Sequence, residues 1–178
     1  MDLWKIQNKR AGQALNRNIN MADWDKRFIE LTRHISSWSK DRSIGTCAII
    51  ADDDHRIIST GFNGFPSGAN DEIEDRFERP KKYLFTEHAE RNAIYNAARV
   101  GISTRGCTMY LMWFPCADCA RAIIQSGIKC LVCFPPDYSS EKWGLHFRAA
   151  REMLDECGVT IRFLDGDVSQ FYKPGNSK

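Results

Sequence analysis

The chain has 178 residues, of which 43% are hydrophobic and 27% are charged. This balance predicts one compact domain with a continuous core and excludes a disordered or fibrous protein. The formal net charge is only +2 at pH 7, which does not favour a protein that coats a long polyanion. No apolar run approaches the length of a membrane span, and the polar amino terminus lacks a signal-peptide core. We therefore expect a cytoplasmic protein without membrane contact.

The first half of the chain predicts a polar arm over 1–20 and a helix over 21–40. Five apolar side chains recur in this helix at spacings of three and four, which predicts one core-facing stripe: Trp24, Phe28, Leu31, Ile35 and Trp38. The ranges 45–51 and 56–62 read as two strands joined by an acidic turn. Residues 63–86 are rich in glycine, proline and charge, and we expect a long functional loop there.

The second half alternates between helices and strands. Helices are predicted from 87 or 88 to 99, over 115–127 and over 144–156, and strands over 107–112, 129–134 and 159–164. The last two strands are separated by enough chain for a helical crossover, so we expect them to run parallel. The fold class is therefore α/β, with a five-stranded mixed sheet between two layers of helices. We assign 21–165 to one domain and 166–178 to a tail.

Two short motifs carry candidate metal ligands. His88 belongs to a Glu-His-Ala-Glu run at the start of one predicted helix, and Cys116 and Cys119 belong to a Pro-Cys-Ala-Asp-Cys run at the start of the next. Imidazole and thiolate are ligands that zinc prefers, and three protein ligands leave the fourth position to water, as in catalytic sites. The positive end of a helix dipole favours the thiolate form of both cysteines. The sequence therefore predicts one catalytic zinc ion per chain.

Glu90 completes this constellation because it lies two residues beyond His88. His-x-Glu followed by Pro-Cys-x-x-Cys is the signature of zinc-dependent nucleobase deaminases. Zinc in such a site activates a water molecule, and we expect the Glu90 carboxylate to shuttle protons beside it. The alternative interpretation, a redox Cys-x-x-Cys pair, leaves His88 and Glu90 without a role.

The remaining cysteines and histidines carry weaker signals. The chain contains seven cysteines, and an odd count without a secretory signal favours reduced thiols over a disulfide framework. Five of them are expected to be core thiols: Cys47, Cys107, Cys130, Cys133 and Cys157. Cys130 and Cys133 have metal-ligand spacing, but side chains three apart on a strand point to opposite faces. His34 and His55 are expected at the surface, and His146 is a weak candidate for the mouth of the site.

At the level of whole motifs the chain resembles the deoxycytidylate deaminase branch of the cytidine deaminase superfamily. The matching runs are Ser-Lys-Asp at 39–41, the segment 52–68 that contains Gly-Phe-Asn-Gly, the zinc motifs at 88–94 and 114–129, and 155–159. The resemblance implies the cytidine deaminase-like three-layer fold for 21–165. It also implies conversion of dCMP to dUMP with release of ammonia.

The resemblance further implies roles for individual residues. Asn63 is expected to contact the deoxyribose, and backbone groups of Ala89 and Pro115 are expected to align the base. The loop formed by Phe62, Asn63 and Gly64 contributes in many relatives to an allosteric site for dCTP or dTTP. The family also favours a homo-oligomer, with a hexamer ahead of smaller assemblies. The absence of cysteine and histidine from 65–87 argues against a second, structural zinc.

The phosphate contact and the exact substrate are less constrained by the sequence. Lys40, with Ser39, and Tyr138 are candidate phosphate anchors, although Lys40 could equally be a helix-terminal cation and Tyr138 a packing residue. Trp113 is either a stacking surface for the base or a core aromatic. The segment 135–147 departs from the usual family sequence.

Three classes of function remain open at this stage. The first is a deaminase of a small cytosine nucleotide or nucleoside. The second is a deaminase of a base in RNA or DNA, which the small net charge and the lack of a basic, aromatic-rich stripe disfavour. The third is a zinc-binding regulator without turnover, which the intact Glu90 disfavours.

Overall fold

The computed structural model describes residues 23–41 and 45–166. The predicted arm (1–20) and nearly all of the predicted tail (166–178) lie outside the described residues, so those two assignments stay predictions. Among the described helices, none combines the length and the apolar character needed to cross a membrane.

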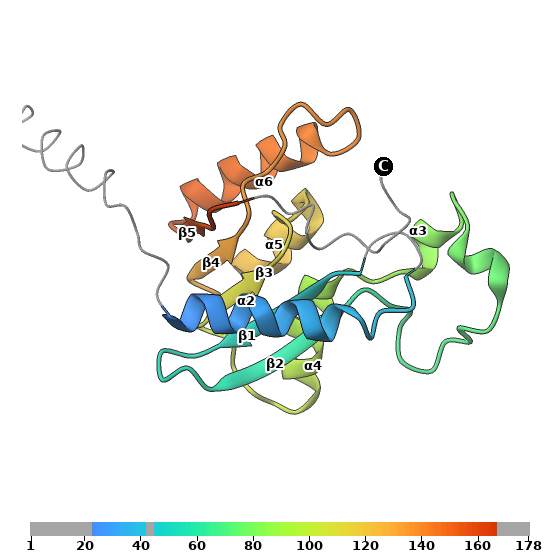
Figure 1. Ribbon diagram of the computed structural model, residues 1–178, viewed down its shortest axis with the longest axis horizontal. Coiled ribbons are helices and arrows are strands. Elements are labelled where there is room, and N and C mark those ends of the chain that lie inside the picture. Colours follow the sequence, from blue (N-terminus) through green and yellow to red (C-terminus); the bar gives the residue numbers. More distant parts are fainter. Residues whose placement is uncertain (1–22, 42–44, 167–178) are drawn as a thin grey trace, which may run out of the picture.

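A five-stranded mixed sheet forms the centre of the molecule (Figure 1). Its strands are β1 (Cys47–Ala51), β2 (Ile57–Phe62), β3 (Thr108–Leu111), β4 (Cys130–Cys133) and β5 (Thr160–Phe163). They lie in the order β2-β1-β3-β4-β5. Strand β1 is antiparallel to β2 and β3, whereas β3, β4 and β5 run parallel. The predicted mixed sheet with parallel last strands is confirmed.

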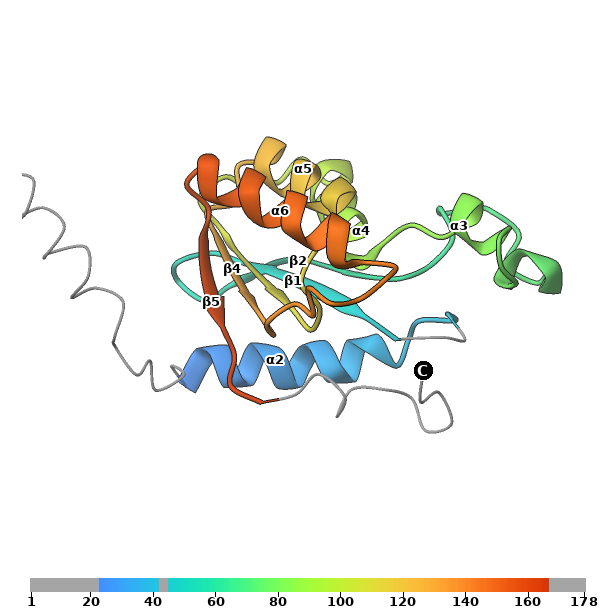
Figure 2. The same ribbon diagram turned by 90° about the horizontal axis from the view of Figure 1, so that it is seen from above.

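Helices cover both faces of this sheet, as Figure 2 shows. Helix α2 (Asp23–Ser36) packs on one face, and α4 (Ala89–Arg99), α5 (Ala117–Gln125) and α6 (Gly144–Glu156) pack on the other. The predicted loop 63–86 contains a short 3-10 helix, η1 (Glu74–Phe77), and a one-turn helix, α3 (Lys82–Phe85). Helix α6 has the bounds that the sequence predicts; α4 begins one or two residues later than predicted, α5 is shorter at both ends, and α2 ends four residues early.

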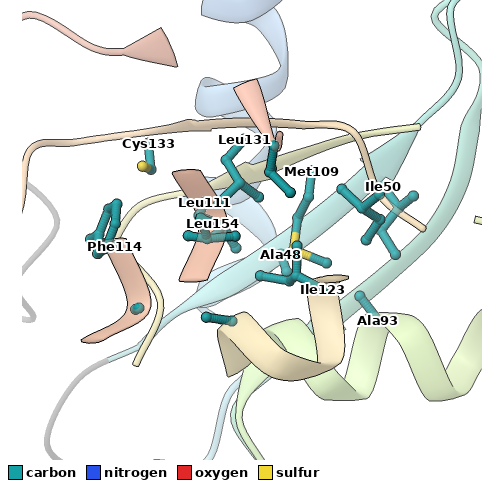
Figure 3. Packing of buried hydrophobic residues seen from close by; sticks show 14 of the residues in the cluster. Ala48, Ile50, Ala93, Met109, Leu111, Phe114, Ile123, Leu131, Cys133 and Leu154 are labelled. Atoms are coloured by element: carbon teal, nitrogen blue, oxygen red, sulfur yellow. The ribbon is translucent and has the colours of Figure 1, made fainter. Parts of the chain in front are cut away.

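Two hydrophobic clusters occupy the two sides of the sheet. The larger cluster joins the sheet to α4, α5 and α6, and its most buried members include Ile50, Met109, Ile123, Leu131 and Leu154 (Figure 3). The smaller cluster joins the sheet to α2 through Phe28, Ile35, Ile49 and Val132, among others. Burial of these aliphatic side chains supplies the driving force that holds the three layers together.

The packing corrects two expectations about buried side chains. Trp24 and Trp38, at the two ends of the predicted stripe, are 40% and 55% exposed, because α2 begins and ends near them and only its middle faces the sheet. Cys157 is exposed, whereas Cys47, Cys107 and Cys133 are buried and Cys130 is half-buried. Cys157 follows the last residue of α6, where the chain has left the core.

The second strand lies directly against the first turns of α4. A Cβ atom built at Gly61 would stand 2.3 Å from the Ala93 nitrogen and 2.4 Å from the Ala89 oxygen, both backbone atoms. Glycine is thus the residue that permits this approach of strand to helix. The contact determines how deeply the start of α4 sits in the fold.

Candidate active site

The predicted metal ligands lie at the starts of two neighbouring helices. His88 directly precedes α4 and Cys116 directly precedes α5, and both have extended backbone conformations (φ −76°, ψ 152° and φ −70°, ψ 170°). Cys119 follows in the first turn of α5. Each helix begins its backbone ladder on the residue before it, with Asn92 donating to the His88 oxygen and Ala120 donating to the Cys116 oxygen, both at 2.9 Å. The two helix starts therefore fix the three side chains relative to one another.

The three ligand atoms converge on one point. Cys119 Sγ lies 3.5 Å and Cys116 Sγ 3.7 Å from His88 Nδ1, and all three atoms lie within 4.8 Å of one another. A nitrogen about 2.0 Å and a sulfur about 2.3 Å from one tetrahedral zinc ion would stand about 3.5 Å apart. The group is thus spaced as zinc requires, and it offers three ligands of the four.

The two cysteines differ in their electrostatics. Hydrogen bonding from Cys119, followed by the contact with His88, lowers the pKa of Cys116 to about 4. The same contact with Cys116, followed by burial, raises the pKa of Cys119. Cys116 is therefore the thiol of the pair that ionises more easily, and a bound divalent cation would displace the proton of Cys119.

Glu90 lies beside this group with its side chain buried. It is 7% exposed, and its carboxylate interacts with His88, Cys116 and Cys119. Burial raises the pKa of Glu90 above its ordinary value. A carboxylate with a raised pKa accepts a proton more readily than an ordinary one and can return it, which is what acid–base catalysis requires.

Asn63 links the end of β2 to the start of α4. Its side-chain oxygen accepts a hydrogen bond from the Ala89 N–H at 2.9 Å, and its backbone oxygen accepts one from Ser39 Oγ at 2.7 Å. The Asn63 side-chain nitrogen points to Asp41 at 3.5 Å. Asn63 thus satisfies the first N–H of α4 and holds that helix start to the segment before β1.

Other predicted residues surround this centre. Ala89 is fully buried, and Pro115, also fully buried, immediately precedes Cys116. Phe62 is half-buried with its ring 6.3 Å from that of Trp38, and Gly64 pairs with Glu87 in an isolated β-bridge. The predicted effector loop is thus tied to the residue that precedes His88.

The candidate phosphate anchors have other surroundings. Lys40 Nζ lies 2.7 Å from Asp71, and its side chain is 65% exposed. Tyr138 is 39% exposed, and its backbone oxygen accepts a hydrogen bond from Arg148 at 2.8 Å. Neither observation tests a contact with phosphate, so both assignments stay predictions.

Three further features escape reasoning from sequence motifs. The Trp143 ring lies 6.4 Å from the His88 ring at 67°, so the segment 135–147 supplies an aromatic wall to the site. Lys82 and Asp41 form a buried ion pair at 2.7 Å, behind Asn63. Arg91 pairs with Glu87 and interacts with the Cys119 thiol. Lysine and tryptophan carry no metal-site signal, and only the departure of 135–147 from the family pattern could have pointed to Trp143.

A comparison with known protein families identifies a match over most of the described fold. The cytidine and deoxycytidylate deaminase zinc-binding region matches residues 22–134. This range contains the three ligand residues, Glu90 and Asn63. It covers more than half of the chain, and it ends at the residue that follows β4.

Similar proteins and structures agree with this match. An uncharacterized deaminase from the luxG 3′ region of Aliivibrio fischeri is 38% identical over 151 residues, which cover 83% of this chain and 98% of that protein. Human deoxycytidylate deaminase is 32% identical over 147 residues, which cover 79% of each chain. The crystal structure of dCMP deaminase from the cyanophage S-TIM5, in complex with dCMP and dUMP, superposes with a TM-score of 0.63 at 25% identity. It covers 78% of this chain and 95% of the phage chain.

Proposed function

Because the chain belongs to the cytidine and deoxycytidylate deaminase zinc-binding family, we propose that it hydrolyses dCMP to dUMP and ammonia. The observation that carries the proposal is the buried Glu90 carboxylate beside the His88, Cys116 and Cys119 group. A hydrolytic deaminase needs a carboxylate beside its metal ligands, whereas a purely structural zinc site does not. The choice of dCMP rests on the relatives named deoxycytidylate deaminase, which match most of the chain.

The residues present fit zinc, and each has a separate task. His88, Cys116 and Cys119 would hold the ion, which when bound activates a water molecule for attack on C4 of the pyrimidine. Glu90 takes one proton from that water and delivers it to N3. It then moves the second water proton to the amino group, which leaves as ammonia. The oxygen stays on C4, so cytosine and water become uracil and ammonia.

The start of α4 also supports a role in substrate alignment. The Asn63 side-chain oxygen accepts a hydrogen bond from the Ala89 N–H. This contact places a polar side chain directly beside the helix start that carries Glu90. We assign Asn63 to the deoxyribose and the backbone of Ala89 and Pro115 to the base. Burial of Ala89 and Pro115 keeps these backbone groups in one position, as alignment of a small planar ligand requires.

Regulation and assembly form a separate part of the proposal. We assign the loop of Phe62, Asn63 and Gly64 to binding of dCTP or dTTP, and we assign the chain to a homo-oligomer, with a hexamer as the expected size. The pairing of Gly64 with Glu87 supports the first assignment, because it joins this loop to the residue before His88. Light scattering of the protein and dCMP assays with each effector test the two assignments.

The decisive test of the reaction is Glu90→Gln, with Glu152→Gln as the matched control on the exposed side of α6. The amide that replaces the Glu90 carboxylate cannot carry protons, so we expect ammonia release from dCMP to fall by about 100- to 10,000-fold. Zinc content, measured by atomic emission, should stay that of the unmodified protein. The control should keep both properties.

Two results would overturn parts of this proposal. An active Glu90→Gln variant would remove Glu90 from the mechanism. Unmodified protein that releases ammonia from cytidine, deoxycytidine, dCTP or a tRNA but not from dCMP would overturn the substrate.

A further inference from the structure

We propose that Lys142, held between Tyr83 and Trp143 beside the metal site, binds the 5′-phosphate of the substrate and selects nucleotides over nucleosides. The inference deepens the proposed function and rests on it for the cytosine nucleotide. It assigns a residue that the motifs leave open, on a segment whose sequence departs from the family pattern.

Trp143 forms part of the wall of the site. Its ring meets the His88 ring edge-on at 6.4 Å, and it also stacks with the Phe147 ring at 6.4 Å. The Trp143 backbone N–H donates to Ser140 Oγ at 3.2 Å. Gly144 follows it where a Cβ atom would come within 2.5 Å of the Tyr138 oxygen, so the backbone here is closely packed. The position of residue 142 is therefore fixed relative to His88.

The Lys142 ammonium group lies close to two aromatic rings. Its Nζ donates a hydrogen bond to Tyr83 Oη, and it lies 4.4 Å from the Tyr83 ring centre and 4.7 Å from that of Trp143. Tyr83 belongs to α3, which is 59 residues away in the chain. The ammonium group thus bridges α3 and the segment before α6. Contacts with ring faces hold a cation in place without neutralising its charge.

Lys142 has no acidic partner among the described residues. Within residues 23–41 and 45–166, no carboxylate lies within 4.0 Å of Lys142 Nζ. By contrast, Lys40 is paired with Asp71 and Arg91 with Glu87. Of these three cations, Lys142 is therefore the one whose charge remains available to an anion.

The groups around Lys142 have positions and chemistry that suit a 5′-phosphate. The Trp143 ring lies 6.4 Å from the His88 ring and 4.7 Å from Lys142 Nζ, so one side chain adjoins both the metal group and the ammonium group. Tyr83 accepts the hydrogen bond from Lys142, so its own O–H proton remains able to donate to a phosphate oxygen. Arg79 adds a second cation, 6.0 Å from the Tyr83 ring centre. A phosphate dianion at this position would meet the Lys142 ammonium group and the Tyr83 hydroxyl, with the Arg79 guanidinium near the same tyrosine ring.

The test compares Lys142→Met with Lys142→Arg, and uses Lys129→Met, exposed at the amino end of β4, as the control. Kinetics are measured on dCMP and on deoxycytidine, with zinc content as a check on the site. Loss of one charged contact to phosphate should raise the KM for dCMP by about 10- to 100-fold and leave kcat within about 2-fold. The values for deoxycytidine should not change. Lys142→Arg should recover most of the dCMP affinity.

A second variant separates the phenol from the ring. Tyr83→Phe keeps the aromatic face and removes the hydroxyl, so we expect a smaller rise in the KM for dCMP, about 2- to 10-fold. This variant should leave deoxycytidine unaffected.

The outcomes distinguish this inference from the proposed function. An unchanged KM for dCMP in Lys142→Met, or equal losses on dCMP and deoxycytidine, would refute the phosphate contact while dCMP deamination stands. Unmodified protein that prefers deoxycytidine to dCMP would refute both. A loss of zinc in Lys142→Met would make Lys142 a structural residue and would also refute the inference.

Discussion

Two Cys-x-x-Cys pairs occur in this chain, and the structure uses them in opposite ways. Cys116 and Cys119 lie at the start of α5, and both sulfurs stand within 3.7 Å of His88 Nδ1. Cys130 and Cys133 are the two ends of β4, and they face different layers: Cys130 packs toward α2 and Cys133 toward α4, α5 and α6. Identical spacing thus brings two thiols together on a helix and separates them on a strand.

The electrostatics follow the same division. The pKa of Cys116 is lowered to about 4 through its contacts with Cys119 and His88. Burial raises the pKa values of Cys130 and Cys133, and the Cys130 sulfur accepts a hydrogen bond from the Arg162 side chain at 3.1 Å. A thiol becomes a ligand where a helix start, a partner thiol and an imidazole act together. Spacing alone does not produce that environment.

The largest expected effect comes from the same substitution in the two pairs. Cys119 and Cys133 are both fully buried, so Cys119→Ser and Cys133→Ser each replace a buried thiol with a hydroxyl group. We expect Cys119→Ser to lose at least about 100-fold in zinc affinity, because changes even to the partners of ligands cost about 10- to 100-fold. Deaminase activity should be lost with the metal. Cys133→Ser should keep one zinc per chain, as measured by competition with a chelator.

If the comparison between the pairs is wrong, these two variants will reveal it. Equal zinc loss in both would mean that Cys133 supports the metal site through the core. Full zinc content in Cys119→Ser would remove that residue from the ligand set.

An intermediate effect is expected on stability. Cys133→Ser places a hydroxyl group in an apolar cluster. Burial of an unpaired hydroxyl should lower the free energy of unfolding by about 1–3 kcal/mol. Urea unfolding followed by circular dichroism measures this change. A loss below about 0.5 kcal/mol, on the scale of an ordinary surface substitution, would indicate that the site is wetter than its burial implies.

The smallest effect is expected at the other end of β4. Cys130 is half-buried, and a serine oxygen at this position can still accept the hydrogen bond from Arg162. Arg162 also keeps its pair with Asp25 at 2.8 Å. Cys130→Ser should therefore change the free energy of unfolding by no more than about 0.5 kcal/mol and leave zinc binding unchanged. Loss of metal in this variant would contradict the division between the two pairs.

Much of the fold was predictable because its signals are local. The bounds of α6 follow from sequence periodicity, and the parallel pairing of β4 and β5 follows from the length of the crossover between them. The exposure of Trp24, Trp38 and Cys157 was not predictable. Periodicity identifies the face of a helix, but it does not say where along the helix the sheet stops covering that face.

The site divides in the same way. His88, Glu90, Cys116 and Cys119 were predicted together because residue type and spacing both point to zinc chemistry. The contact of Trp143 with His88 joins residues 55 positions apart in the sequence. It depends on how the segment before α6 folds back. The Lys82–Asp41 and Lys142–Tyr83 contacts also join distant segments. Long-range contacts between loops leave no pattern within either loop.

Gly61 carries a consequence for how this sequence can diverge. Its missing side chain lets β2 touch the backbone of α4 at Ala89 and Ala93, one and five residues beyond the predicted ligand His88. Any side chain at this position would clash with the backbone of α4, so β2 or the start of α4, next to His88, would have to move. The geometry of the metal group is therefore inherited partly from a strand residue that offers no ligand atom.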